Sequence, residues 1–234
     1  MAKDEKQPGS KPGRPQGKDS GRKTGGSGSG KKFDAAVTAA AEQPAKEAPR
    51  LKVAFDEKVR AKVAEKFGVS NRNAQPKLEK IVININMGRH IEGTKIPPDK
   101  RTTVLETLTK ITGQKPIVIK ARKSVSNFKL REGMESSAMV TMRRNRMWWF
   151  LDRLINLTTP RIKDFRGLPD KAFDRQGNYS MGLTEQGVFP EINMAEATFT
   201  HGMHINFVFR NSKPELSRFV LEELGMPFVK PDQK

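Results

Sequence analysis

The sequence predicts an α+β fold in which helices pack on one face of a largely antiparallel sheet, preceded by a disordered basic N-terminal tail. Segments with an apolar residue at every second position alternate irregularly with segments of helical periodicity. The connections between them are too short for parallel crossovers between several strand pairs. We therefore predict a low-complexity extension over residues 1–50 and a single domain over residues 51–234.

The extension is distinguished by its composition. Residues 9–32 consist mainly of Gly, Ser, Pro and Lys and offer no apolar side chain to bury. Such a segment cannot offset the entropy lost on ordering, which predicts disorder. Residues 33–49 are compatible with a short Ala-rich helix that is broken before Pro44.

The domain begins with a predicted helix over residues 52–68 and a predicted strand over residues 77–88. In the helix Val53, Val59, Val63 and Phe67 lie near one face, and Gly68 suits the C-cap. The strand has one apolar face and one face with two amides, because Ile81, Ile83 and Ile85 alternate with Val82, Asn84 and Asn86.

The middle of the domain contains a second helix and two strands that flank a loop. Residues 97–113 start with prolines, repeat apolar residues at Val104, Leu108 and Ile111, and end at Gly113, which predicts a helix. Residues 115–121 and 136–144 are predicted strands on either side of the loop.

The last part of the domain contains two more helices and two more strands. Asn145 is a candidate cap for a helix over residues 146–159, which Pro160 ends. Strands are predicted over residues 177–183 and 201–211, and a final helix over residues 212–225. Adjacent Trp148 and Trp149 point about 100° apart on a helix, so we expect one in the core beside Leu151 and Ile155 and the other partly buried.

The charge of the chain predicts a polyanionic partner. Lys and Arg number 44 against 26 Asp and Glu, a net charge of +18. Residues 115–146 hold nine cations and two anions, whereas the chain after residue 175 holds five cations and seven anions. The most basic stretch is the loop KARKSVSNFKLREG over residues 120–133, in which Val125, Phe128 and Leu130 are too scattered to form a core.

Several classes of protein are disfavoured. No apolar run is long enough to cross a membrane and no secretory signal opens the chain, so nucleic acid is the expected polyanion. The absence of cysteine excludes disulfides and thiol chemistry and fits a reducing cytoplasm. We expect no cofactor and no metal site, and we interpret His90, His201 and His204 as surface or sheet residues.

Two rival functions remain to be weighed. A metal-dependent nuclease needs clustered carboxylates, yet the basic region offers only Glu132 and Glu135. A free nucleoid or RNA-chaperone protein would account for the charge but not for the ordered series of elements. The extension has two open interpretations: a solubilising segment, or a basic arm that orders along RNA.

Five segments together resemble one family. Residues 76–88, 108–134, 150–168, 173–192 and 221–228 are similar, in order, to the bacterial form of ribosomal protein number five of the large subunit. The resemblance spans nearly all of residues 51–230 and implies a non-enzymatic, cytoplasmic ribosomal protein that binds 5S rRNA in the central protuberance. Implied partners are 5S and 23S rRNA, the peptidyl-site tRNA, neighbouring central-protuberance proteins and a small-subunit head protein.

The resemblance implies a 5S rRNA surface of short polar side chains and nearby cations. An Asn on the first strand is part of it, but counting from residues 76–80 gives Asn84 and counting from residues 86–88 gives Asn86. Amides and hydroxyls of this kind can bond to sugar hydroxyls and base edges. The resemblance also implies Gln114 and Thr141. We add the cations beside these two residues as candidate RNA contacts, Lys115, Arg143 and Arg144, although residues 143–146 can also be interpreted as a solvated turn.

The resemblance also implies that the basic loop reaches the elbow of the peptidyl-site tRNA. Its cations attract phosphates irrespective of base sequence, and Phe128 adds one apolar platform. Family members often have Ala-Gly where this chain has Ser126 and Asn127, which leaves the bend of the loop open. The implied tRNA contacts are Arg122, Lys123, Ser124, Asn127, Phe128, Lys129 and Arg131. A bridge to the small-subunit head is implied for the later, less basic part, without assigned residues.

Overall fold

A computed structural model describes residues 48–88, 96–195, 197 and 199–229. The predicted extension, His90 and the last five residues therefore lie outside the described part of the chain, apart from residues 48–50. No helix in this part is long and apolar enough to cross a membrane.

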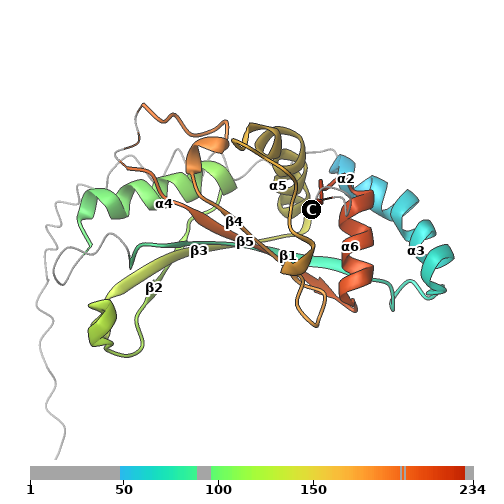
Figure 1. The fold of residues 1–234 in the computed structure, drawn as a ribbon, viewed down its shortest axis with the longest axis horizontal. Coiled ribbons are helices and arrows are strands. Elements are labelled where there is room, and N and C mark those ends of the chain that lie inside the picture. The colour runs from blue at the N-terminus through green and yellow to red at the C-terminus, as the bar shows by residue number, and fades with distance from the viewer. Residues whose placement is uncertain (1–47, 89–95, 196, 198, 230–234) are drawn as a thin grey trace, which may run out of the picture.

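The centre of the fold is a five-stranded antiparallel sheet in the order β2-β3-β1-β5-β4 (Figure 1). The first strand along the chain is thus the central one, and it pairs with β3 on one side and β5 on the other. The strands are β1 Lys77–Asn86, β2 Ile117–Lys120, β3 Glu135–Arg143, β4 Tyr179–Leu183 and β5 Met203–Arg210.

The α-helices of the described residues lie on one face of this sheet, as Figure 1 shows, so the predicted α+β fold is confirmed. α4 lies along the left part of the covered face in this view and α5 over its middle, while α2, α3 and α6 gather at the right-hand end. The main helices are α2 Arg50–Ala54, α3 Arg60–Phe67, α4 Pro98–Thr112, α5 Arg144–Arg153 and α6 Pro214–Glu223.

The alternation in β1 positions the core as predicted. Ile81, Ile83 and Ile85 are fully buried, whereas Val82 and Asn84 on the opposite face are half-buried. Neighbouring strands add apolar residues to the same layer, for example Phe207 opposite Ile81. Each large apolar side chain buried in this way contributes about 1.5–3 kcal/mol.

The first helical segment shows that the predicted apolar face was wrong at one residue. Val53 is 39 % exposed, and the buried residues are instead Leu51, Phe55, Val59 and Val63. A π-helical turn, η1 Phe55–Val59, separates α2 from α3. The four buried residues are spaced four apart, and on an α-helix with 3.6 residues per turn this spacing would rotate them steadily away from one face. The wider π turn offsets part of this rotation, so all four side chains stay on one face.

The start of α5 also differs from the prediction. Asn145 is not its N-cap: the helix begins at Arg144, and Arg143 at the cap position makes no side-chain capping bond. β3 runs directly into α5, and the chain turns at Arg144, whose φ is 54°. The helix continues through a π turn, η4 Leu154–Thr158, into a 3-10 turn, η5 Thr159–Arg161, that contains Pro160.

The aromatic and histidine predictions have mixed outcomes. Trp148 is buried against Phe55, with ring centroids 5.4 Å apart, and Trp149 is half-buried, as expected. His204 is an exposed sheet residue on β5, also as expected. His201 is neither exposed nor in a strand: it is buried just before β5, where its backbone N–H donates to Gln186 Oε1 at 2.7 Å.

Replacing Gly113 by alanine is expected to destabilise the protein by about 1–2 kcal/mol. Gly113 ends α4 with a φ of 64°, and a Cβ built there meets nothing within 4 Å. The cost therefore comes from backbone strain alone, so Gly113→Asn, which tolerates this conformation better, should lose less. Urea unfolding of both variants measures the difference, and equal stability of Gly113→Ala and the parent would contradict it.

Candidate nucleic-acid interface

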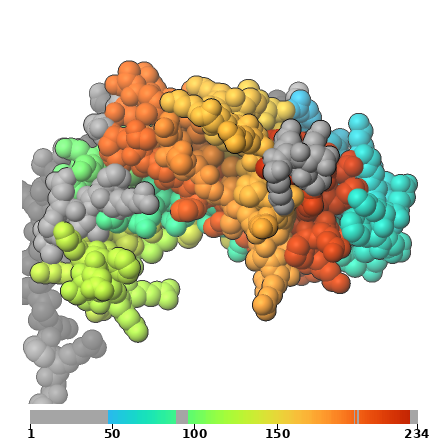
Figure 2. Space-filling view, viewed as in Figure 1, coloured from blue at the N-terminus to red at the C-terminus, as the bar shows by residue number. Residues whose placement is uncertain are grey.

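The sheet face opposite the described α-helices, which we call the open face, carries several short polar side chains. By strand alternation it presents Asn84 and Asn86 from β1, Thr141 from β3 and Asn206 from β5. Figure 2 shows the molecule hollowed on this side, between the lime tip of the basic loop and the orange projection that precedes β4. The surface is therefore concave and rich in hydrogen-bonding groups.

Three of the predicted residues are linked through β1, β3 and the end of α4. Asn84 pairs with Met139 and Val82 pairs with Thr141, so Asn84 and Thr141 are diagonal neighbours on one face. With its side-chain amide oriented so that both partners are satisfied, Gln114 donates to the backbone carbonyl oxygen of Thr141 at 3.2 Å and accepts from Arg146 Nη1 at 3.2 Å. Gln114 thereby joins the end of α4 to β3 and to a cation.

Asn84 and Asn86 differ in their hydrogen bonds. Asn86 Oδ1 accepts from the backbone N–H of Gly88 at 2.8 Å, which fixes a turn at the end of β1. Asn84 Oδ1 has no hydrogen-bond partner among the described residues. Asn86 also lies opposite Ser137, farther from Thr141 than Asn84 is. The position nearer to Gln114 and Thr141 is therefore Asn84.

Cations gather where β3 ends. Arg143 lies directly opposite Lys80 of β1, and both belong to the open-face positions of their strands. Like charges facing each other across two strands destabilise a sheet, which points to an anionic partner at this end. Arg144, which follows Arg143, is exposed, and so is Lys115, which follows Gln114. Lys80 was not predicted as an RNA contact, because nothing in one strand indicates which residue it faces.

Two further polar residues on the open face were not predicted. His204 pairs with Asn84, and Asn206 pairs with Val82. Both alternate with buried residues of β5, so the polar face of that strand was visible in the sequence. Their position beside β1 was not, because it depends on the strand order.

The basic loop, residues 120–133, forms a closed hairpin that connects β2 to β3. Val125 and Leu130 pair with each other through backbone bonds of 3.0 and 3.1 Å, on either side of the 3-10 turn η3 Ser126–Phe128. Ser124 Oγ accepts the backbone N–H of Glu132 at 2.9 Å. The loop is thus held by its own hydrogen bonds, and the Ser124 hydroxyl helps to fix its shape.

The loop presents its cations and one aromatic ring to solvent. All seven predicted tRNA contacts are exposed, and Phe128 has the largest apolar side chain among them, with 71 % of its surface exposed. Asn127 does not need a positive φ, because it lies in the 3-10 turn and the positive φ of 53° falls on Lys129. The loop therefore has a defined bend at Ser126 and Asn127, although these residues stand where family members often have Ala and Gly.

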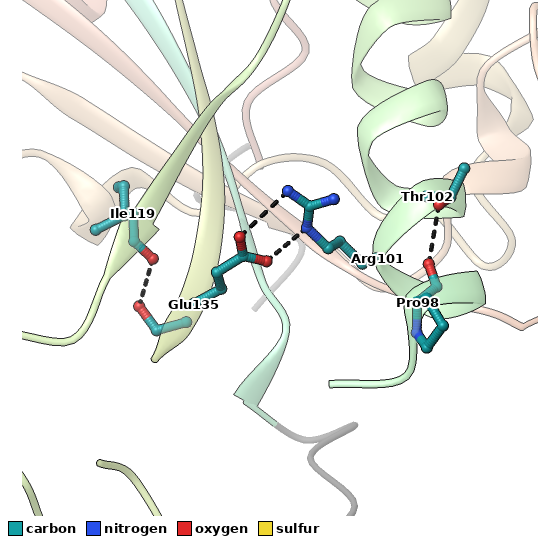
Figure 3. Close-up of polar contacts among 6 residues, drawn as sticks. Pro98, Arg101, Thr102, Ile119 and Glu135 are labelled. Carbon is teal, nitrogen blue, oxygen red and sulfur yellow. Dashed lines mark hydrogen bonds and ion pairs between the residues drawn. The ribbon is translucent and has the colours of Figure 1, made fainter. Parts of the chain in front are cut away.

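An ion pair removes one of the two acidic groups of this region. Arg101 reaches from α4 to Glu135 at the start of β3 (Figure 3), with Nε donating to Oε2 at 2.5 Å and Nη2 donating to Oε1 at 3.2 Å. Glu135 is thus neutralised by a two-point contact. Only the exposed Glu132 remains to offset the cations of the loop.

The same contact argues against the nuclease alternative. A catalytic metal needs several free carboxylates, and Glu135 is engaged with Arg101. No group of three or more His, Asp or Glu side chains in the described part of the chain could hold a metal ion.

Comparison with known proteins gives consistent matches along the described domain. Two family models match adjacent parts of the chain: that of "Ribosomal protein L5" over residues 71–131, and that of the C-terminus of the same ribosomal protein family over residues 135–228. The chain is 44 % identical over 186 residues to the "Large ribosomal subunit protein uL5" of Rhodopirellula baltica, covering 80 % of this chain and 93 % of the relative. It is 47 % identical over 180 residues to the Leifsonia xyli protein of the same name, covering 77 % and 90 %.

Proposed function

Because this chain belongs to the L5 family of large-subunit ribosomal proteins, we propose that it binds 5S rRNA through the open face of its sheet. As a family member it is a structural, non-enzymatic component of the ribosome, which places it in the bacterial cytoplasm. The proposed RNA-binding unit spans residues 51–234, and residues 1–50 are an extension to it.

The observation that supports 5S rRNA binding best is the junction of Gln114, Thr141 and Arg146 beside Asn84. Amides and hydroxyls can form hydrogen bonds with the sugar hydroxyls and base edges of RNA. Contacts of this kind let a protein recognise an RNA by its shape. The cations at the end of β3 and in its surroundings then bind phosphates: Lys80, Lys115, Arg143 and Arg144. We propose that Asn84 is the RNA contact on β1. Asn86 instead stabilises the turn at the end of β1 through its hydrogen bond with Gly88.

The basic loop is proposed to contact the peptidyl-site tRNA. A surface that accepts every tRNA has to bind backbone phosphates and not base sequence, and the loop offers exposed cations on a fixed hairpin. The remaining partners, 23S rRNA, neighbouring central-protuberance proteins and a small-subunit head protein at a bridge, are proposed from family membership alone.

Gln114→Ala is expected to weaken 5S rRNA binding by about tenfold, because it removes two hydrogen bonds that organise the interface. Thr141→Val, which removes only the hydroxyl, should also weaken binding. Filter binding or fluorescence anisotropy across a range of salt measures both variants against 5S rRNA and a duplex RNA of equal length. Gln176→Ala, at an exposed glutamine in the turn before β4, is the matched control.

The parent protein should prefer 5S rRNA to the duplex, and this preference should survive as salt rises. Equal binding of both RNAs with a slope of roughly −0.9 per phosphate contact would mean purely electrostatic binding and would contradict the proposal. The same titration of a chain that starts at residue 51 separates the two interpretations of the extension. If the extension is a general basic arm, the shortened chain binds both RNAs more weakly by the same factor. If the extension is dispensable, the shortened chain binds both RNAs as tightly as the full chain does.

A further inference from the structure

We propose that a groove between the open face and the basic loop receives one unpaired nucleobase of 5S rRNA. The groove has a volume of about 520 Å³. Phe128 and Leu130 of the loop line one side, and Asn84, Asn86 and Ser137 of the sheet line the other. The inference rests on the proposed 5S rRNA function and adds to it a defined place for a single base.

The lining of the groove is neutral, although it adjoins the most basic part of the chain. None of the lining residues that the structure describes is charged, whereas exposed cations flank Phe128 and Leu130 in the loop, among them Lys129 and Arg131. A phosphate would bind to the cations and leave the groove to an uncharged group. A nucleotide offers these two parts together, a neutral base attached to a charged backbone.

The hydrogen-bonding groups of the groove suit the edge of a base. Asn84 Oδ1 is a buried acceptor with no hydrogen-bond partner among the described residues. Asn86 uses its Oδ1 for Gly88, which leaves its amide N–H groups as donors. Ser136, also in the lining, donates its hydroxyl to the Ile119 carbonyl at 3.1 Å and can still accept. The groove thus offers donors and acceptors side by side, as base edges do.

Phe128 supplies the stacking surface that single-stranded bases need. An aromatic ring that is 71 % exposed at the tip of a hairpin makes little contribution to the core. Stacking of one base on an aromatic ring contributes about 1–3 kcal/mol to the free energy of binding of unpaired RNA, and every base can stack in this way. We choose 5S rRNA over tRNA as the source, because Asn84 in the groove lies next to Thr141 in the proposed 5S rRNA surface.

The test uses the full chain with 5S rRNA, deacylated tRNA and duplex RNA as separate probes. Phe128→Leu keeps an apolar side chain but removes the ring, and should weaken 5S rRNA binding by about fivefold or more without changing the salt slope. Phe128→Trp keeps an aromatic ring and should bind 5S rRNA about as tightly as the parent protein does. 5S rRNA should quench the fluorescence of the added tryptophan, which is obtained by subtracting the signal of the parent protein with its two tryptophans. Val125→Leu and Val125→Trp, in the same loop but outside the lining, are the matched controls.

Two results would overturn the inference and leave the proposed function standing. One is unchanged 5S rRNA binding by Phe128→Leu while Gln114→Ala still weakens it. The other is a loss confined to tRNA, which would make Phe128 part of the tRNA contact only. If neither Phe128→Leu nor Gln114→Ala affects 5S rRNA, the proposed function fails together with the inference. Circular dichroism confirms that each variant is folded.

Discussion

Phe207→Ala is expected to lower the free energy of unfolding by about 3–5 kcal/mol, the usual loss for a large aromatic side chain in a core. Phe207 is fully buried on β5, pairs with Ile81 on the central strand and with Tyr179 on β4, and its ring centroid lies 6.0 Å from that of Tyr179. The cavity left by the ring opens between three strands, where no single side chain can fill it. For a domain of this size the melting temperature should fall by roughly 10 °C.

The adjacent residue provides the control. Val208 lies on the opposite, open face of the same strand and is half-buried, so Val208→Ala should cost much less, about 1 kcal/mol or below. Thermal and urea unfolding followed by circular dichroism compare the two variants. Equal losses would mean that the covered face of the sheet does not hold the core.

Neutralising the basic loop is expected to have the largest effect on RNA binding. With four cations changed to glutamine, the affinity for deacylated tRNA at about 0.1 M salt should fall by up to roughly a thousandfold. The reason is that each phosphate contact releases counterions, so loss of four contacts should also flatten the slope of log affinity against log salt by about 3 to 4. The four substituted residues are Arg122, Lys123, Lys129 and Arg131.

A variant with the same change in net charge separates a local effect from a general one. Four exposed lysines outside the loop are suitable for this control: Lys52, Lys58, Lys171 and Lys213. It should lose far less tRNA affinity than the loop variant. If both variants lose the same amount, the loop has no special part in tRNA binding and only the overall charge matters.

Much of the fold was predictable because it depends on local patterns. The alternation in residues 77–88 identified both faces of β1, and the glycines after two helices identified their ends at Gly68 and Gly113. The position of the basic loop between two strands was also predicted and is confirmed. In each case the residues that determine the structure lie within one element.

The unpredicted features depend on contacts between distant elements or on irregular backbone. Val53 is exposed because it lies two residues from the buried Leu51 and Phe55, about 200° around the helix. The π turn at Phe55–Val59 then keeps Val59 on the buried face, whereas periodicity analysis assumes a regular helix. Asn145 has the right composition for a cap, yet the direct passage from β3 into α5 moves the start of the helix to Arg144. In the candidate interface, the pairing of Lys80 with Arg143 follows from strand register, which one sequence does not reveal.

The central position of β1 has a consequence for how the protein is made. One of its two neighbours, β5, begins at Met203, far along the chain from the end of β1 at Asn86. At roughly 5–20 residues per second, the ribosome synthesises β5 on the order of 6–25 s after β1. During that interval one edge of the nascent central strand has no partner and is open to pairing with other chains. The concave face is complete only when translation is nearly finished, so this component of the translation machinery joins its RNA after its own synthesis.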